Sequence, residues 1–342
     1  MKSFASDNYA GVLPEVMEAL QQANSGHAGS YGNDPLTKST MALFREVLGA
    51  EVDVHLVFNG TGANVLSLSA AAQSYNAVLC ADTSHIYNDE SSAPETFTGC
   101  RFFALPTNEQ GKLEPETVSQ RLIRRGDLHF PQIKILSLTQ STEYGTVYTP
   151  EELKAFGKLC KEQGLYFHID GSRFFNAAAS LGCSLKQIST DIGVDLLSLG
   201  GTKLGMMFGE AVVVFNEQLR EHLPFKHKQV MQLASKTRFI AAQYQALLQG
   251  ELWRRTAEHA NAMARLLHEA LQSFPQIRVT RPVEANVVFA IIPLAWNEAL
   301  MQQFPFYVWR EDLNEVRLMC AWDTQEEEIN ALIQSIKQLA GV

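Results

Sequence analysis

Short apolar runs alternate with amphipathic segments along the first two thirds of the chain. Nearly continuous apolar runs are typical of strands in a sheet that is covered on both faces. Such runs occupy residues 54–58, 77–80, 101–105, 134–140, 165–170, 195–200 and 210–215. Residues 115–125 and 150–164 have helical spacing, and each segment opens with a proline, which suits the first turn of a helix. This alternation predicts an α/β fold with a mostly parallel central sheet.

The pattern changes after residue 215. Residues 235–273 have a long helical periodicity, and short apolar runs return afterwards. Strands are expected at 277–280, 286–293, 306–309 and 315–322, with helices near 296–304 and from Thr324 onward. This order predicts a smaller C-terminal α+β domain with an antiparallel sheet. We place the boundary near Gly250, which gives a large domain of residues 1–250, N-terminal segment included, and a small domain of residues 251–342.

Composition narrows the class of protein. The chain has 342 residues, of which 46% are hydrophobic and 19% charged, a balance typical of globular proteins. Its formal net charge of −9 disfavours nucleic acid or a membrane surface as a main partner. The five cysteines are widely spaced, which indicates free thiols in a reducing compartment. We expect a cytoplasmic protein without a membrane span, and no metal site, because His, Cys, Asp and Glu do not cluster at ligand spacings.

A glycine-rich turn follows the first expected strand. In Asn59-Gly60-Thr61-Gly62, the backbone N–H groups at a helix start and the positive end of the helix dipole suit a phosphate. Glycine also lets the backbone approach a ligand closely. The turn is not a dinucleotide fingerprint, because Val65 stands where the third glycine would be. A tight strand–helix turn without a ligand is the alternative interpretation.

An aspartate ends the expected strand at 165–170. Ligands of open α/β sheets bind at the carboxyl ends of the strands, and Asp170 stands at such an end. An aspartate there would pair with a protonated ring nitrogen and keep it charged, and that charge makes a pyridine ring an electron sink. The alternative is a helix N-cap followed by a surface arginine at position 173.

Lys203 lies among glycine, leucine and methionine residues, an unusual setting for a lysine. A desolvated lysine at a strand end is a good nucleophile for an aldehyde, and the hydroxyl of Thr202 would suit a phosphate. His85 follows another strand and would stack on a flat ring. An exposed loop lysine and a hydrogen-bonded loop histidine are the alternatives. Taken in order with the phosphate turn and Asp170, these features predict a pyridoxal 5′-phosphate site with Lys203 as the Schiff-base residue.

The same residues carry a resemblance to a known enzyme family. The chain resembles the threonine aldolase / aromatic amino acid β-eliminating lyase family, which has the fold of the pyridoxal-phosphate-dependent transferases (aspartate aminotransferase-like), and especially its low-specificity L-threonine aldolase branch. The matching segments are SDNYAG (6–11), YGNDP (31–35), NGTGAN (59–64), SHIYNDE (84–90), GDLHF (126–130), SLTQSTEYGTVYTPEEL (137–153), HIDGSRFFNA (168–177), SLGGTKLG (198–205), GEAVVVF (209–215) and VRLMCAWDT (316–324). The resemblance therefore covers nearly the whole chain.

The resemblance implies roles for the matching residues. Lys203 would bind the cofactor covalently, Asp170 would pair with its ring nitrogen, and His85 would stack on the ring. The full set expected to hold the cofactor is Gly60, Thr61, Gly62, His85, Asp170, Arg173, Thr202 and Lys203. The residues expected to hold the substrate carboxylate are Ser6, Arg173 and Arg317. His129, or a water that it orients, would act with His85 near the β-hydroxyl of the substrate.

The resemblance also implies a homodimer or homotetramer in which two subunits complete each site. Tyr31 and the basic stretch 226–238 are expected to reach the neighbouring subunit's site. Three residues of that stretch are alternative phosphate contacts: Lys228, Lys236 and Arg238. The chain departs from the family pattern at Asn8, where the family often has threonine. It departs again at Leu204, where the nearest branch has asparagine, and this residue follows Lys203 directly, so the substrate preference stays open.

These implications predict an enzyme that cleaves the Cα–Cβ bond of L-threonine, L-allo-threonine or a related 3-hydroxy amino acid to glycine and an aldehyde. A β-eliminating lyase, a racemase or a phenylserine-type aldolase on the same scaffold is the first alternative. Glycine plus an aldehyde indicates the aldolase, whereas pyruvate plus ammonia indicates the lyase. A protein of this fold that has lost catalysis is the second alternative, and a purified protein without the yellow colour of the cofactor would favour it.

Overall fold

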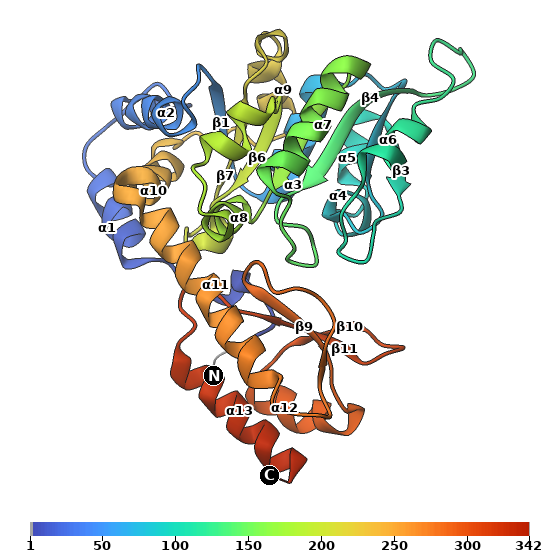
Figure 1. The fold of residues 1–342 in the computed structure, drawn as a ribbon. Helices are drawn as coiled ribbons and strands as arrows, with labels where there is room; N and C mark the ends of the chain where they lie inside the picture. The colour runs from blue at the N-terminus through green and yellow to red at the C-terminus, as the bar shows by residue number, and fades with distance from the viewer. Residues whose placement is uncertain (1–2, 342) are drawn as a thin grey trace.

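The computed structural model describes residues 3–341 and contains two sheets (Figure 1). The larger sheet has seven strands in the order β1-β7-β6-β5-β4-β2-β3. These strands are β1 (Asp53–Val57), β2 (Asn76–Ala81), β3 (Arg101–Leu105), β4 (Gln132–Thr139), β5 (Tyr166–Gly171), β6 (Leu196–Gly200) and β7 (Glu210–Val214). Strands β3, β2, β4, β5 and β6 pair in parallel, and β7 runs antiparallel to both β6 and β1. The expected mostly parallel α/β sheet is therefore confirmed.

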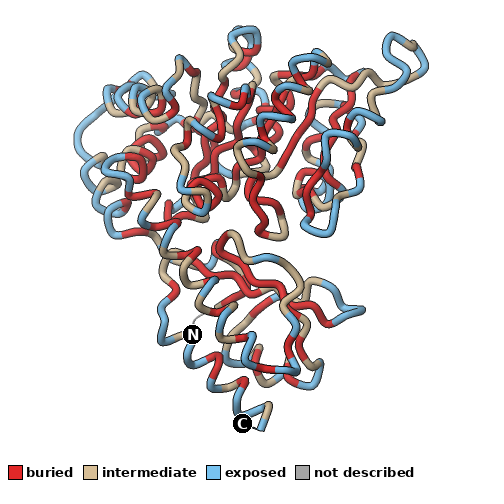
Figure 2. The backbone as a smooth tube through the Cα atoms, viewed as in Figure 1, coloured by how far each residue is buried: buried red, intermediate tan, exposed pale blue. Residues whose placement is uncertain are grey.

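Helices pack around this sheet. They are α1 (Pro14–Ala23), α2 (Pro35–Leu48), α3 (Gly60–Ala71), α4 (His85–Asn88), α5 (Ala93–Thr98), α6 (Pro115–Arg121), α7 (Pro150–Gln163), α8 (Phe174–Leu181), α9 (Leu223–Gln229), α10 (Arg238–Leu248) and α11 (Leu252–Leu271). Every residue of β2, β6 and β7 is buried, as the burial colouring of Figure 2 shows for the centre of the larger unit. Cover on both faces explains why these strands are continuous apolar runs. Within the described residues, no helix is long and apolar enough to cross a membrane.

A smaller unit follows, in the lower part of Figure 1. Its four-stranded sheet has the order β10-β11-β9-β8, and all three neighbouring pairs are antiparallel. Its elements are β8 (Arg278–Val279), β9 (Val287–Ile291), α12 (Asn297–Gln303), β10 (Tyr307–Arg310), β11 (Glu315–Met319) and α13 (Glu326–Ala340). Side chains of α11, β9, β11 and α13 form its core. The expected small α+β domain is confirmed.

Helix α11 connects the two units, and the chain bends just before it. Gly250 and Glu251 both have positive φ angles, +59° and +55°. At the start of α11, Trp253 packs in the core of the larger unit, whereas Leu271 at its end packs in the core of the smaller unit. The N-terminal segment also contacts the smaller unit, because Phe4 is buried in that core. We keep a domain boundary near Gly250 as a proposal.

Candidate active site

Parallel strands of the larger sheet end at one edge, and the residues after them meet in one pocket. His85 follows β2, Glu143 follows β4, Arg173 follows β5 and Lys203 follows β6. The pocket has a volume of about 430 Å³. Residues of the N-terminal segment and of β10 and β11 complete its lining, so it lies between the two units. This is where the topology of an open α/β sheet places a ligand.

Most of the side chains expected at the site line this pocket. They are Ser6, His85, Asp170, Arg173, Lys203 and Arg317. The pocket therefore brings together residues from five separate stretches of the sequence. Thr202, the turn that begins α3, and His129 are not part of its lining.

Lys203 lies in a short 3-10 turn, Thr202–Leu204, directly after β6. Burial, followed by the positive charge of Arg173, lowers the pKa of its amine. Among the described residues, the Lys203 amine has no hydrogen-bonding or ion-pairing partner. A lysine in this state is a good nucleophile toward an aldehyde, because more of it is unprotonated.

A buried carboxyl holds the turn that carries this lysine. Glu210 on β7 accepts a hydrogen bond from the backbone N–H of Gly201 at 2.6 Å, and burial raises the pKa of Glu210 to about 7. The hydroxyl of Tyr244 donates to the carbonyl of Leu199 at 2.6 Å, which fixes the end of β6. The hydroxyl of Thr202 donates to a neighbouring carbonyl, that of residue 209, at 3.4 Å. The lysine is therefore positioned by backbone contacts on both sides.

Asp170 is the centre of a buried hydrogen-bond network. Its Oδ1 accepts from the backbone N–H and the hydroxyl of Ser172, and its Oδ2 accepts from the Asn64 side chain at 2.8 Å. The same Asn64 amide donates to Glu90 at 2.8 Å. Burial would raise the pKa of Asp170, but the nearby His85 and these hydrogen bonds outweigh it and lower the pKa. Asp170 is therefore an ionised carboxylate, which suits a protonated ring nitrogen.

His85 begins α4, and Nδ1 of its ring lies 2.8 Å from Oε1 of Glu90. This hydrogen bond raises the pKa of His85, so its ring keeps a proton to higher pH. Ligand atoms of His85, Glu90 and Asp170 lie within 4.8 Å of one another, a spacing that would also suit a metal ion. The amide of Asn64 bridges the two carboxylates, and His85 pairs with one of them, so we interpret the cluster as a hydrogen-bond network.

Arg173 is held by an aspartate from the N-terminal segment. Its Nε donates to Oδ2 of Asp7 at 2.7 Å, and its Nη2 donates to Oδ1 at 2.9 Å. Asn286 also donates to Asp7, at 3.1 Å. Burial would lower the pKa of Arg173, but the carboxylate of Asp7 outweighs it and raises the pKa. Arg173 is therefore a fixed cation that lines the pocket, with Nη1 left for another anion.

Arg317 on β11 is the second guanidinium of the pocket. Its charged end lies 5.2 Å from the ring centre of Tyr307 and 5.1 Å from that of Trp309, both on β10. Nη2 donates to the carbonyl of Ala5 at 3.0 Å, whereas Nε is buried without a hydrogen-bond partner among the described residues. Buried donors are nearly always paired in proteins. A bound carboxylate would supply the missing acceptor.

The turn expected to hold a phosphate forms the first turn of α3. Oδ1 of Asn59 accepts from the N–H of Gly62 at 2.7 Å, so this N–H is already paired. The N–H groups of Gly60 and Thr61 belong to the same helix start, where the helix dipole favours an anion. A Cβ atom at Gly60 would come within 4.0 Å of the hydroxyl of Ser172, a pocket residue. The helix start thus adjoins the pocket.

His129 lies apart from these residues. It is exposed, in the loop between α6 and β4, and its backbone N–H donates a hydrogen bond to Oδ1 of Asp127 at 2.9 Å. Its role at the β-hydroxyl stays a prediction.

Several polar residues of the site were missed by sequence reasoning: Asp7, Asn64, Glu90, Glu143 and Glu210. All five lie inside motifs that were recognised, yet carboxylates and amides are too common for their type to be a signal. Their burial is the informative property, and it depends on partners far away in the sequence.

A partnerless lysine amine, an ionised buried aspartate and two guanidinium groups in one pocket define a class of protein. They are the parts of an α/β enzyme that binds an aldehyde cofactor and the carboxylate of a small substrate.

Comparison with known proteins agrees with this class. The model of the beta-eliminating lyase family matches residues 3–293. A low specificity L-threonine aldolase of Pseudomonas aeruginosa is 44% identical over 341 residues, which are 99% of this chain and 98% of that protein. A protein of the same name from a Pseudomonas species (strain NCIMB 10558) is 41% identical over 98% of this chain and 97% of its own length. A structure of Leishmania major threonine aldolase superposes with a TM-score of 0.94 at 29% identity, covering 99% of this chain and all of that one.

The chain belongs to the beta-eliminating lyase family, whose members use pyridoxal 5′-phosphate. The residues present fit that cofactor. Lys203 supplies an amine without a partner, and Asp170 supplies a buried anion. The start of α3 supplies backbone donors for a phosphate.

Proposed function

We propose that this chain is a pyridoxal-phosphate-dependent aldolase that cleaves the Cα–Cβ bond of L-threonine, L-allo-threonine or a related 3-hydroxy amino acid. The products are glycine and an aldehyde. The observation that carries the proposal is the pocket that joins the lysine amine of Lys203, the ionised Asp170 and the partnerless donor of Arg317. The similarity to threonine aldolases over nearly the whole chain supports the same reaction.

Residues of the larger unit would hold the cofactor. Lys203 would bind it covalently, Asp170 would pair with its ring nitrogen, and the ring of His85 would lie against its face. The amides of Gly60 and Thr61 would take its phosphate, with the neighbouring Gly62 and Thr202 completing that end of the site. When bound, the cofactor supplies an electron sink for the pair released at Cα.

Two arginines would orient the amino acid. Arg317, whose Nε has no partner among the described residues, and Arg173, whose Nε and Nη2 are paired with Asp7, would hold the carboxylate of the substrate together with Ser6. Guanidinium groups suit this task because they bind a carboxylate with two parallel hydrogen bonds. Fixing the carboxylate fixes rotation about the bond to Cα, and this orientation decides which bond of Cα is cleaved.

The β-hydroxyl must also lose its proton. His129, or a water that it orients, is the base that the family resemblance implies. The pocket itself is lined by two further groups that exchange protons, His85 and Glu143.

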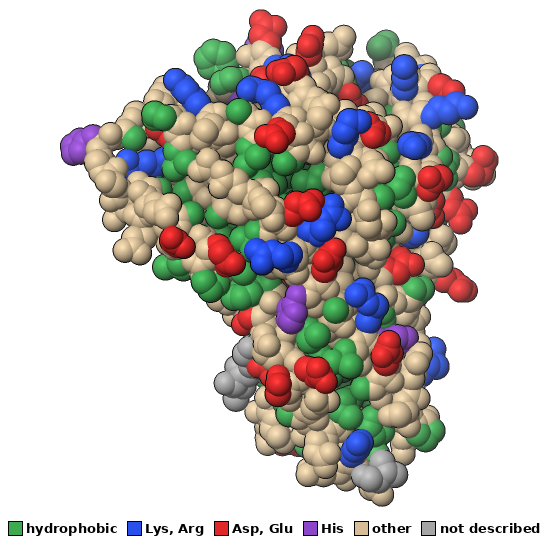
Figure 3. All heavy atoms as spheres, turned by 60° about the vertical axis from the view of Figure 1, so that its left-hand side comes forward, with side chains coloured by type: hydrophobic (Ala, Val, Ile, Leu, Met, Phe, Trp, Pro, Cys, Tyr) green, Lys and Arg blue, Asp and Glu red, His purple; other side chains and the backbone are tan. Residues whose placement is uncertain are grey.

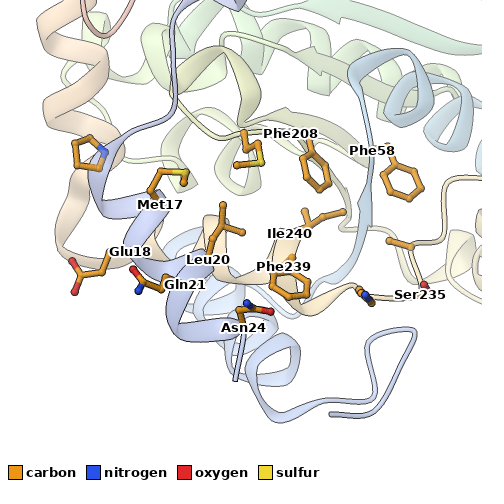
Figure 4. A pocket seen from close by; sticks show the side chains of 14 residues that line it. Met17, Glu18, Leu20, Gln21, Asn24, Phe58, Phe208, Ser235, Phe239 and Ile240 are labelled. Carbon is orange, nitrogen blue, oxygen red and sulfur yellow. The ribbon is translucent and has the colours of Figure 1, made fainter. Parts of the chain in front are cut away.

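We also propose that two copies of the chain assemble around each site, as a homodimer or homotetramer. An apolar groove with a volume of about 990 Å³ lies between α1 and α10. Figure 4 shows Met17 and Leu20 of α1 facing Phe239 and Ile240 of α10 across it. Hydrophobic side chains gather on this side of the larger unit in Figure 3. Exposed apolar side chains that gather at one groove, Met17 and Met207 among them, support a protein–protein contact.

The residues expected to cross to a neighbouring subunit lie beside this groove. Lys236 lines the groove. The backbone N–H of Tyr31 donates to the carbonyl of Ser235, the residue before Lys236. Lys228 lies over the ring of Tyr31 at 5.0 Å, and Arg238 donates to the carbonyl of Gly26.

All five cysteines are free, which supports a cytoplasmic location.

The test is product analysis. The protein, loaded with pyridoxal phosphate, is incubated separately with L-threonine and L-allo-threonine, and glycine and acetaldehyde are measured together. Equal release of both products is expected, and the two rates rank the epimers. Release of 2-oxobutyrate and ammonia instead, the products of β-elimination from threonine, would replace the aldolase by a β-eliminating lyase.

A further inference from the structure

Glu143 follows β4 and lines the same pocket as Lys203. Its Oε1 accepts two hydrogen bonds, from the hydroxyl of Thr139 at 2.8 Å and from the backbone N–H of His85 at 2.8 Å. Its Oε2 accepts no hydrogen bond from any other residue that the structure describes. The carboxyl group is thus held at a fixed place in the pocket, with one oxygen left for a ligand.

The surroundings of Glu143 favour proton exchange near neutral pH. Burial raises its pKa to about 7, against the two hydrogen bonds, and the negative charge of Asp170 adds to the effect. The other titratable or charged groups near it or lining the same pocket are Cys80 on β2, His85 on α4, Asp89 after α4, Tyr148 after β4, Arg173 after β5, Lys203 after β6, Tyr307 on β10 and Arg317 on β11. Cys80 and Tyr148 are neutral neighbours, because burial raises the pKa of both groups. A group that titrates near the working pH is an efficient general base.

The histidines of the site are less suited to this task. The hydrogen bond to Glu90 raises the pKa of His85, and a protonated imidazole has no free nitrogen to accept a proton. His129 is exposed and does not line the pocket of its own chain.

We propose that Glu143 is the base that removes the proton of the substrate's β-hydroxyl. This inference rests on the proposed aldolase function. The proton of the β-hydroxyl moves to Oε2 of Glu143. The electron pair of the broken O–H bond becomes the second bond of the aldehyde C=O. The Cα–Cβ bond breaks, and its pair stays on Cα, where one proton completes glycine. One proton leaves the hydroxyl and one is added at Cα, so the reaction needs no further reactant.

The matched test is Glu143→Gln, which keeps an oxygen for the two hydrogen bonds from Thr139 and His85 but cannot take a proton. We expect kcat for L-threonine to fall about 10²- to 10⁴-fold, the usual contribution of a general base. Two readouts should stay near wild type: the visible absorbance of the bound cofactor, and the exchange of the α-proton of glycine in D₂O. Exchange at glycine involves no β-hydroxyl, so a general loss of structure would reduce it and a lost base would not.

Glu109→Gln is the control, because Glu109 is exposed in the loop after β3. This variant should cleave threonine at the wild-type rate. A Glu143→Gln variant that cleaves L-threonine at the wild-type rate overturns the inference. A wild-type protein that exchanges glycine but cleaves no 3-hydroxy amino acid overturns the proposed function itself, and this result is distinguishable from the first.

The wild-type pH profile tests the inference without any substitution. We expect kcat for threonine to fall as the pH drops below about 7, because Glu143 becomes protonated. The rate of glycine exchange should not show this acidic limb of the pH profile. His129→Asn should retain the limb and Glu143→Gln should lose it. The opposite pattern in the two variants would assign the proton to His129 and reject Glu143.

Discussion

Asp7 and Arg173 show what single residues contribute to this site. They form an ion pair across 166 positions of sequence, with N···O distances of 2.7 and 2.9 Å, in which the Asp7 carboxylate is buried and the Arg173 side chain is 14% exposed. Burial would raise the pKa of Asp7, but the guanidinium of Arg173 outweighs it and lowers the pKa below 3.8. Asp7 therefore remains ionised, and it holds both a pocket arginine and the N-terminal segment.

We predict that Asp7→Asn lowers the free energy of unfolding by about 3–5 kcal/mol, because it leaves the Arg173 charge buried without a partner. Since the folded-state pKa of Asp7 is depressed, the pair contributes fully above the unfolded pKa of about 3.9 and is lost as the pH falls through the folded value. Urea unfolding at neutral and acidic pH measures both effects.

The exposed pair of Arg310 and Asp312 provides the control for Asp7. Asp312→Asn should change the stability much less, because water screens exposed charges. Equal losses in the two variants would show that burial gives the Asp7 pair no special weight.

Sequence reasoning found the residues whose chemistry is rare and missed those whose chemistry is common. A lysine among glycines and an aspartate at a strand end were informative as residue types, and both line the pocket at Lys203 and Asp170. Asp7 and Glu143 were not singled out, because their importance comes from burial against partners that folding brings near. A sequence records those partners only after the topology is known.

At the scale of elements, the 3-10 turn after β6 depends on one glycine. Gly205 ends this turn with a φ of +98°, and its carbonyl accepts from the N–H of Leu13 at 2.9 Å. A Cβ atom at this position would lie 2.5 Å from Cγ of Leu13. The turn therefore needs glycine both for its backbone angle and for the close approach of the N-terminal segment.

We predict that Gly205→Ala lowers the free energy of unfolding by more than about 1 kcal/mol, and that it weakens retention of the cofactor on Lys203. Thermal unfolding and cofactor absorbance after dialysis measure the two effects. Gly11→Ala is the matched control, because a Cβ atom at Gly11 meets nothing within 4 Å, and its change should stay within about 0.5 kcal/mol. Similar losses in both variants would contradict the steric argument.

The bounds of an element were predicted well where its apolar side chains pack into the core. The run 101–105 coincides with β3. The helix expected at 115–125 ends at Arg121 instead, because Ile123 is exposed and has no apolar surface to cover. The last helix begins at Glu326 and not at Thr324, whose hydroxyl accepts the N–H of Ala321 in the turn before it. Such ends are set by local hydrogen bonds that hydrophobic spacing does not record.

At the scale of the whole molecule, the pocket needs both units. Lys203 and Asp170 come from the larger unit, Arg317 comes from the smaller one, and Ser6 comes from the segment that contacts both. A substrate that binds across this pocket links the two units. The apolar groove beside α10 extends the same reasoning to a second copy, because Met17 and Met207 are 47% and 45% exposed there.

If two copies share each site, inactive variants should complement one another. We predict that mixing Lys203→Ala with the triple variant Lys228→Ala/Lys236→Ala/Arg238→Ala restores threonine cleavage that neither protein has alone. In a mixed assembly, one of the shared sites combines an intact lysine from one copy with intact basic residues from the other. The variants are unfolded and refolded together, and glycine release is measured.

The control for this mixture is Lys203→Ala with Asp170→Ala. Both residues line the pocket of one chain, so every site in the mixed assembly still lacks one of them, and no activity should return. Recovery in the first mixture and not in the second would place the basic stretch at the neighbouring site. If neither mixture recovers although sedimentation shows mixed assemblies, the basic residues act within their own chain, and the groove between α1 and α10 joins copies whose sites are independent.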